Sequence, residues 1–369
     1  MALPEPSFIT RDPAAIVAEM VASYEATTGK ILQPAQVERV LIDLIAYREN
    51  LIRIGIQEAA KQNLVEYAIF PMIDYLGELV GVARLVAQSA RCTIRFYLTA
   101  AQAFNVTVPA GTRVETKDGQ QIFATEFNLT ITAGQAFGDV SAVCQTAGVI
   151  GNSYVAGDVN NLVDVVANVN SAANTTTTSG GSDEESDDAM RARIKLAPER
   201  FSNAGSYGAY RFHALSAHPD IVDVAITSPI AGVVNVYPLT KTGNPDSIMI
   251  DLVTAALTDE KVRPLTDQVA VLSPTQKDFT ITAEITLFDW ADSDTVTAAV
   301  DAALTTYADN QRAILGRDVV LTQIIAEING VYGVYKTVLS APAADVVNAA
   351  NEWSNCTAIT VTVAGFVNG

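Results

Sequence analysis

Two kinds of pattern meet at the run RCTIRFYL, residues 91–98. Within it Cys92, Ile94, Phe96 and Leu98 alternate with polar or amphipathic residues, and a period of two is typical of a half-buried β-strand. Before it, apolar residues instead recur at helical spacing. We therefore predict a helical region over residues 1–90 and a β-domain that begins at residue 91.

The β-domain is predicted to extend over residues 91–173. Its strongest local signal is Asp118-Gly119 between two alternating runs, which indicates a hairpin. Several short strands separated by glycines are typical of a small sandwich or barrel. The predicted strands cover residues 92–98, 106–108, 114–116, 121–124, 129–132, 140–144 and 163–169.

Three helices are predicted before the β-domain. The first begins with Asp12 as N-cap and Pro13 at the first helical position, and it ends at Gly29. The second is long, running from residue 37 past residue 55 toward residue 67, and the third covers residues 72–80.

The long helix carries an apolar stripe opposite charged residues. Its members include Val37, Leu41, Leu44 and Leu51. Such a stripe fits the core of a local bundle and also a seam onto which partner helices pack, because both use a/d-like spacing. At this point both interpretations stay open.

Downstream of the β-domain the run NTTTTSGG, residues 174–181, contains no apolar anchor and predicts a linker or exposed loop. Acids at 183–188 then precede Arg191 and Arg193, a polarity that matches the helix dipole, and Ser182 or Ser186 is the expected cap. We treat residues 174–181 as a candidate hinge.

Two α+β lobes are predicted to follow, over residues 182–275 and 276–369. The expected helices lie near 205–217 and 246–257, around Val296 to Tyr307, and after Asp318 as a cap; the expected strands are 221–227, 233–236, 279–288, 334–339 and 358–363. The fold class is thus multidomain α+β, with an N-terminal helical region, a small all-β domain and lobes with mostly antiparallel sheets.

The composition argues against several classes of partner. The 41 acidic against 23 basic residues give a net charge of −18, which disfavours binding to nucleic acid and to an anionic membrane surface. No run of about 18 apolar residues and no signal-peptide pattern occur, so we expect no membrane span and folding in the cytoplasm. The mean hydropathy of +0.22 with few charges fits either a soluble monomer or a subunit that buries surface in an assembly.

No motif indicates catalysis or a cofactor. The acidic run fails the EF-hand pattern, because Asp188 and Ile194 stand where Gly and Glu are required. His213 and His218 are five residues apart, off the register for two metal ligands on one helix face, and we expect a surface and a capping histidine. The three cysteines form no CxxC pair, and neither a nucleophile elbow nor a phosphate loop occurs. We expect no metal, no cofactor and no enzymatic activity, although a carboxylate pair stays possible.

From Tyr75 onward the order of motifs resembles the baseplate J-like family. The matching stretches are residues 75–84, 108–112, 133–134, 147–152, 180–194, 204–206 with Tyr210, 223–224 and 232–234. Within them the motif positions are Arg84, Gly111, Asn152, Asp183, Glu185, Ser186, Asp187, Arg191, Arg193, Gly205, Ser206 and Tyr210.

This resemblance implies a non-enzymatic wedge subunit of a contractile tail baseplate, located in the virion tail after assembly in the host cytoplasm. It implies a homodimer in the wedge, a second wedge subunit, a sheath-initiating wedge protein and neighbouring wedges of a ring as partners. It also implies that the subunit relays the change that triggers sheath contraction. On that basis the long helix, through Val37, Leu41, Leu44 and Leu51, is the candidate for a helix-bundle interface.

Two other functions stay open. A host-surface binding tail protein would need exposed Tyr or Trp clusters, and the only two tryptophans are Trp290 and Trp353. A tail-associated glycoside hydrolase would work through two carboxylates.

Overall fold

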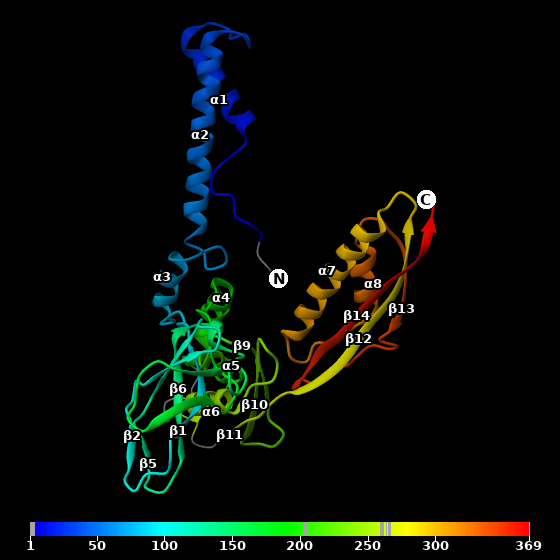
Figure 1. The fold of residues 1–369 in the computed structure, drawn as a ribbon. Helices are drawn as coiled ribbons and strands as arrows, with labels where there is room; N and C mark the ends of the chain where they lie inside the picture. The colour runs from blue at the N-terminus through cyan, green and yellow to red at the C-terminus, as the bar shows by residue number, and fades with distance from the viewer. Residues whose placement is uncertain (1–3, 202–205, 259–261, 263, 265–266, 369) are drawn as a thin grey trace. The chain divides into compact units, whose positions relative to one another are not determined.

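The computed structural model describes residues 4–201, 206–258, 262, 264 and 267–368, and Figure 1 shows its helices and strands. Two compact units are present. The first consists of the residues up to 83 together with 186–195, and the second consists of 84–185 and the residues from 196 onward. The chain therefore crosses between the units at three places in the sequence.

The first unit is helical and contains the predicted N-terminal helices, but it also includes residues 186–195, which we expected in the α+β domain 182–275. It contains α1 (Pro13–Thr28), α2 (Val37–Lys61), α3 (Met72–Leu79) and α4 (Asp187–Leu196). The Asp12 side chain accepts from the Ala14 amide at 3.0 Å, and Gly29 ends α1 with a φ of 68°, so both predicted ends of the first helix are confirmed.

Helix α1 packs on one side of the longer α2, as Figure 1 shows. Ile16, Ile42 and Ala46 are buried in this contact region. Gln57 of α2 is fully buried and holds the segment before α1: its Nε2 donates to the Pro6 carbonyl at 2.7 Å, and its Oε1 accepts from the Phe8 amide at 2.9 Å. This pairing satisfies a polar side chain that would be costly to bury alone.

The second unit begins with a near-barrel. Its six-stranded sheet has the order β7-β3-β4-β6-β1-β8, and a separate pair, β2-β5, packs on the same core. Ile94, Phe96 and Phe123 are fully buried in that core. The strands are β1 (Ser89–Leu98), β2 (Val106–Val108), β3 (Arg113–Thr116), β4 (Ile122–Thr125), β5 (Leu129–Ile131), β6 (Phe137–Ala147), β7 (Val159–Leu162) and β8 (Val169–Asn174).

The predicted hairpin is confirmed, while one predicted strand is wrong. β3 and β4 pair antiparallel across a turn in which Gly119 has a φ of 70°. Residues 163–168 are not a strand, because the chain turns there at Asn168, with a φ of 65°, and Val165 is 99% exposed. Of the valines at residues 163–168 only Val166 packs against the near-barrel core, so the run lacks the continuous buried face of a strand.

Residues 174–181 are not an open linker. Asn174 and Thr178 are buried, and the backbone of Ser179 exchanges hydrogen bonds with Arg91 of β1 at 2.8 and 3.1 Å. Thr178 is bonded in the same way to the chain at residues 153 and 154. The polar threonines therefore complete the near-barrel, and the hinge hypothesis for this segment is wrong.

Two α+β lobes follow, as predicted. The first contains a sheet of order β11-β10-β9, in which β9 and β10 are antiparallel. The second has the order β13-β12-β14, in which β12 pairs antiparallel with β13 and parallel with β14. The elements are α5 (Tyr207–Leu215), β9 (Ile221–Thr227), β10 (Val233–Thr240), α6 (Ser247–Thr258), β11 (Gln268–Val271), β12 (Thr275–Phe288), α7 (Ser293–Arg312), α8 (Leu321–Asn329), β13 (Val334–Ala341) and β14 (Glu352–Val367).

Two local predictions in these lobes are wrong. Asp318 does not cap α8: the Leu321 amide donates to Asp345 at 2.8 Å, while Asp318 accepts from the Asn348 amide. His218 is neither on the surface nor a helix cap, because it is 4% exposed and its Nδ1 accepts from the Asp220 amide at 3.1 Å. In both cases the partner lies further along the chain: Asp345 accepts from the Leu321 amide, and the Asp220 amide donates to His218.

Burial lowers the pKa of His218 below its usual value of about 6.5, and the nearby charges are Asp220, Asp246 and Lys241. The unfolded chain therefore binds a proton at a higher pH than the folded chain, so stability falls as the pH drops below about 6.5. We expect His218→Asn, which keeps an acceptor near the Asp220 amide, to lose less stability between pH 7.5 and pH 5 than the unmodified chain. Urea unfolding at the two pH values measures this, and equal losses in both proteins would contradict it.

Candidate functional site

Helix α2 exposes the apolar stripe that the sequence singled out. Val37 is 72% exposed, Leu41 54%, Leu44 58% and Leu51 45%, although α1 covers the opposite side of the same helix. These side chains do not form a local core in the chain itself. We define the open face of α2 as Val37, Val40, Leu41, Leu44, Ile45, Tyr47, Leu51, Ile52 and Ile54, all of them exposed.

The open face of α2 is wider than the seam of a two-stranded coiled coil. Val37, Val40, Leu44, Tyr47, Leu51 and Ile54 alternate at spacings of three and four, which is an a/d pattern. Leu41, Ile45 and Ile52 form a further row beside it. A face of this width offers contact area to more than one partner helix.

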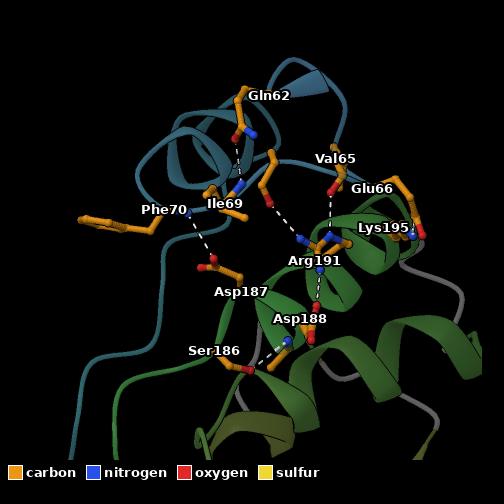
Figure 2. Close-up of polar contacts among 12 residues, drawn as sticks. Gln62, Val65, Glu66, Ile69, Phe70, Ser186, Asp187, Asp188, Arg191 and Lys195 are labelled. Carbon is orange, nitrogen blue, oxygen red and sulfur yellow. Dashed lines mark hydrogen bonds and ion pairs between the residues drawn. The ribbon is translucent and has the colours of Figure 1, made fainter. Parts of the chain in front are cut away.

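The connection from α2 to α3 is held by α4, as Figure 2 shows. Arg191 donates from Nε to the Val65 carbonyl at 2.8 Å and from Nη2 to the Ala68 carbonyl at 2.7 Å. Asp187, at the first position of α4, accepts from the Phe70 amide at 3.1 Å. Arg191 and Asp187 thus form hydrogen bonds with backbone groups of this connection, which lies outside the helices.

Other motif residues of α4 act at its two ends. Ser186 accepts from the Ala189 amide at 3.3 Å, which confirms Ser186 as a cap of α4. The buried Arg193 donates to the Ala83 carbonyl. Lys195 pairs with Glu66 and lowers the pKa of that carboxyl, but both side chains are about half exposed, so this pair contributes little stability.

Gly77 lets α3 lie close to α4. A Cβ on Gly77 would approach the Val82 carbonyl oxygen to 2.6 Å and the Met190 side chain to 2.7 Å. Because one of these atoms belongs to the backbone, the position requires glycine. The family-like motif around residues 75–84 is therefore explained in part by this packing.

In the second unit, motif residues form hydrogen bonds between segments that are distant in sequence. Arg84 donates to the Glu185 carbonyl at 2.6 Å, and the Glu185 carboxylate accepts from the Leu85 amide at 3.0 Å. Asn152 bonds to both the amide and the carbonyl of Gly181, at 2.8 and 2.7 Å. Asp183 accepts from the Val149 amide at 3.1 Å.

The remaining motif positions have local roles. Ser206 caps α5 by accepting from the Ala209 amide at 3.2 Å. The buried Tyr210 donates to Asp267 at 2.8 Å. Gly111 adopts a φ of 83° at the turn after β2. Gly205 lies outside the described residues.

Four family models match the chain in order: the baseplate J-like N-terminal domain at residues 39–91, the barrel domain at 93–181, the central domain at 202–273 and the C-terminal domain at 279–362. The chain belongs to the baseplate J-like family. The barrel match includes residues 174–181, in agreement with their place in the near-barrel.

Among the relatives of this baseplate J-like chain is the baseplate protein J of Escherichia phage P2. It is 36% identical over 182 residues, which are 49% of this chain and 60% of that protein. The match therefore spans less than two thirds of the relative's length. A chain of the cryo-EM structure of the anti-feeding prophage (AFP) baseplate matches over 94% of this chain and 90% of its own length, with a TM-score of 0.43 and 14% identity. At these values the likeness is too weak to support an inference.

The baseplate J-like chain also has an exposed aromatic cluster that the sequence pattern did not predict. Phe288 stacks on Trp290 with ring centres 5.4 Å apart, and Tyr335 and Tyr332 contact these two rings. Tyr332 is 83% exposed and Trp290 52%, whereas Trp353 is buried. The four rings meet because β12 pairs with β13, a pairing that residue spacing does not encode.

The carboxylates with shifted pKa values differ from those of a general acid. A general acid needs a raised pKa, and hydrogen bonds to the charged form lower the pKa of each carboxyl group in this set. Asp164 is lowered furthest, to about 2, by Arg113. The others are Glu66, Asp118, Asp139, Asp278, Asp292 and Glu352.

The described residues contain neither a cluster of metal ligands nor a helix that could span a membrane. No group of three or more His, Cys, Asp or Glu side chains is arranged to hold a metal ion there. Likewise, no described helix has the length and apolar character needed to cross a bilayer.

Proposed function

We propose that this chain is a structural, non-enzymatic wedge subunit of a contractile tail baseplate, without a cofactor, located in the virion tail after assembly in the host cytoplasm. The observation that carries the proposal is the open face of α2, an apolar surface of nine exposed side chains on a 25-residue helix. Family membership and the name of the phage P2 relative support it.

The width of the open face leads us to two partner helices. The a/d row, which includes Leu44 and Leu51, would pack against α2 of a second copy, and the adjacent row, which includes Ile45 and Ile52, against a helix of a second wedge subunit. Burying a valine, leucine or isoleucine side chain contributes about 1.5–3 kcal/mol, so the eight aliphatic residues of the open face suffice for a stable bundle even after the cost of association.

In the proposed relay, movement passes along the segments where the chain crosses between the two units. Arg84 and Glu185, which flank two of the crossings, are hydrogen bonded to each other in the second unit, and Arg193 is bonded to Ala83 in the first. A movement of the helical unit would reach the second unit through covalently linked segments that are each anchored. Neighbouring wedges and a sheath-initiating wedge protein are the partners that would receive it.

Co-expression of the chain with candidate wedge proteins from the same source tests this function. We expect a stable complex that contains two copies of this chain and a second wedge subunit, and density for the chain at the tail base in images of particles. A chain that stays alone in co-purification and is absent from particles would overturn the proposal.

A host-surface binding role is the second candidate, because the aromatic cluster of Phe288, Trp290, Tyr332 and Tyr335 supplies the exposed rings that sugar stacking needs. On this hypothesis Trp290→Ala reduces binding of the purified chain to whole cells or a glycan array at least tenfold. Phe104→Ala, also at an exposed ring but in the near-barrel, is the matched control. Equal binding by both variants, or no binding by the unmodified chain, would remove this candidate. No specific observation favours the glycoside hydrolase.

A further inference from the structure

Strand β14 is a long strand at the edge of its sheet. It has 16 residues, and its parallel pairing with β12 extends from Thr275–Glu352 to Phe288–Val367. In the order β13-β12-β14 no described strand pairs with its other side. One row of backbone donors and acceptors of β14 is therefore left without a sheet partner among the described residues.

The free edge of β14 lacks the features that usually protect an edge strand. Soluble proteins place charges, especially lysine, or proline at such edges to prevent pairing with other chains. Residues 353–367 contain neither a charged residue nor a proline. The opposite edge of the same sheet is protected, because β13 carries Lys336 and Pro342 follows its last residue.

The core beneath β14 is also incompletely covered. Ile359, Val361 and Val363 pack against the core of the C-terminal lobe, yet each stays partly exposed, unlike the fully buried Ile281 and Ile285 of β12. A further strand beside β14 would cover these side chains. The chain itself supplies no such strand among its described residues.

The sequence of β14 matches itself when two copies run antiparallel. Residues 358–364 are AITVTVA, which is the same in both directions about Val361 except that isoleucine and valine exchange places. In antiparallel pairing about a two-fold axis at Val361, Thr360 lies opposite Thr362 of the second copy, and Ile359 lies opposite its Val363. Like side chains then meet on both faces, and such cross-strand pairs stabilise a sheet.

We propose that β14 pairs antiparallel with β14 of a second copy, centred on Val361, and joins two three-stranded sheets into one of six strands. This surface is separate from the open face of α2, so the pairing is a second homotypic contact. It does not depend on the helix bundle, and each contact can fail without the other.

Cysteine cross-linking of the full-length chain tests the pairing. The background is Leu44→Asp/Leu51→Asp, which removes the α2 contact, with Cys356→Ser to remove the thiol nearest the site. We expect Val361→Cys to give a covalent dimer with a short thiol cross-linker at micromolar protein, because residues opposite each other in antiparallel strands have Cβ atoms about 4.5–5.5 Å apart. Lys336→Cys, on β13, is the control and should stay monomeric.

A charge test in the same background gives an independent measurement. Thr360→Asp/Thr362→Asp places like charges opposite each other and should weaken dimerisation at least tenfold in sedimentation. Thr280→Asp/Thr286→Asp puts the same charges on the same sheet face, on the central strand β12, and should leave dimerisation unchanged. The proposal is overturned if the unmodified edge gives only monomers, if Lys336→Cys cross-links as well as Val361→Cys, or if the edge variant dimerises like its control.

Discussion

Leu44→Asp/Leu51→Asp is expected to abolish association of the chain with its helix partners while leaving its own fold intact. Both side chains are exposed in the chain, at 58% and 45%, so the substitutions remove few internal contacts. In a bundle they would replace two buried leucines by two desolvated carboxylates. The loss of hydrophobic burial alone is about 1.5–3 kcal/mol per residue, and an unpaired buried charge adds several more.

We therefore expect at least a hundredfold weaker association in co-purification or sedimentation, with an unchanged melting temperature. Two control variants show what a substitution with no effect and a substitution that destabilises the fold would look like. Val165→Asp changes a side chain that is 99% exposed in the near-barrel and should affect neither property, whereas Ala46→Asp, at a 2% exposed position facing α1, should lower the melting temperature. Partner binding by the Leu44/Leu51 variant at the unmodified level would rule out the open face as the interface.

Arg191→Met is expected to destabilise the connection between α2 and α3 by about 2–4 kcal/mol. The substitution keeps the apolar stem but removes the donors to the Val65 and Ala68 carbonyls, and Ala68 is fully buried. A buried carbonyl without a partner costs its full desolvation penalty. The ion pair with Asp188 adds little, because that carboxylate is 94% exposed.

Hydrogen exchange of the amides at 62–70 and urea unfolding would measure this effect. Lys195→Met is the matched control on the same helix, since its pair with Glu66 is exposed and should contribute little stability. Equal exchange rates and equal unfolding in the two variants would mean that Arg191 does not anchor the connection.

Local pattern predicted most of the secondary structure. The Asp12 and Gly29 ends of α1, the length of α2 and the Asp118-Gly119 hairpin depend on residues close in sequence, where propensity and capping act. The pattern failed at residues 163–168, because alternating valines specify a strand only when one of their faces is buried.

The candidate site was predictable as a set of residues but not as a set of contacts. Arg191 and Asp187 belong to a motif visible in the sequence, yet their partners at Val65, Ala68 and Phe70 lie more than a hundred residues away. Spacing along the chain carries no information about such pairs. The threonine-rich run at 174–181 was predicted to be a linker for the same reason, because its hydrogen-bond partners on β1 are distant in sequence.

Period and residue type alone were enough to establish which side of α2 is apolar and that residues 358–363 form a strand, because a helix and a strand repeat at 3.6 and 2 residues wherever they lie. Whether an apolar side is covered depends on which distant segments pack on it. That is why the open face of α2, the free edge of β14 and the aromatic cluster around Trp290 emerged only once the chain was folded: α1 covers one side of α2 and not the other, and β12 pairs with one edge of β14 and not the other.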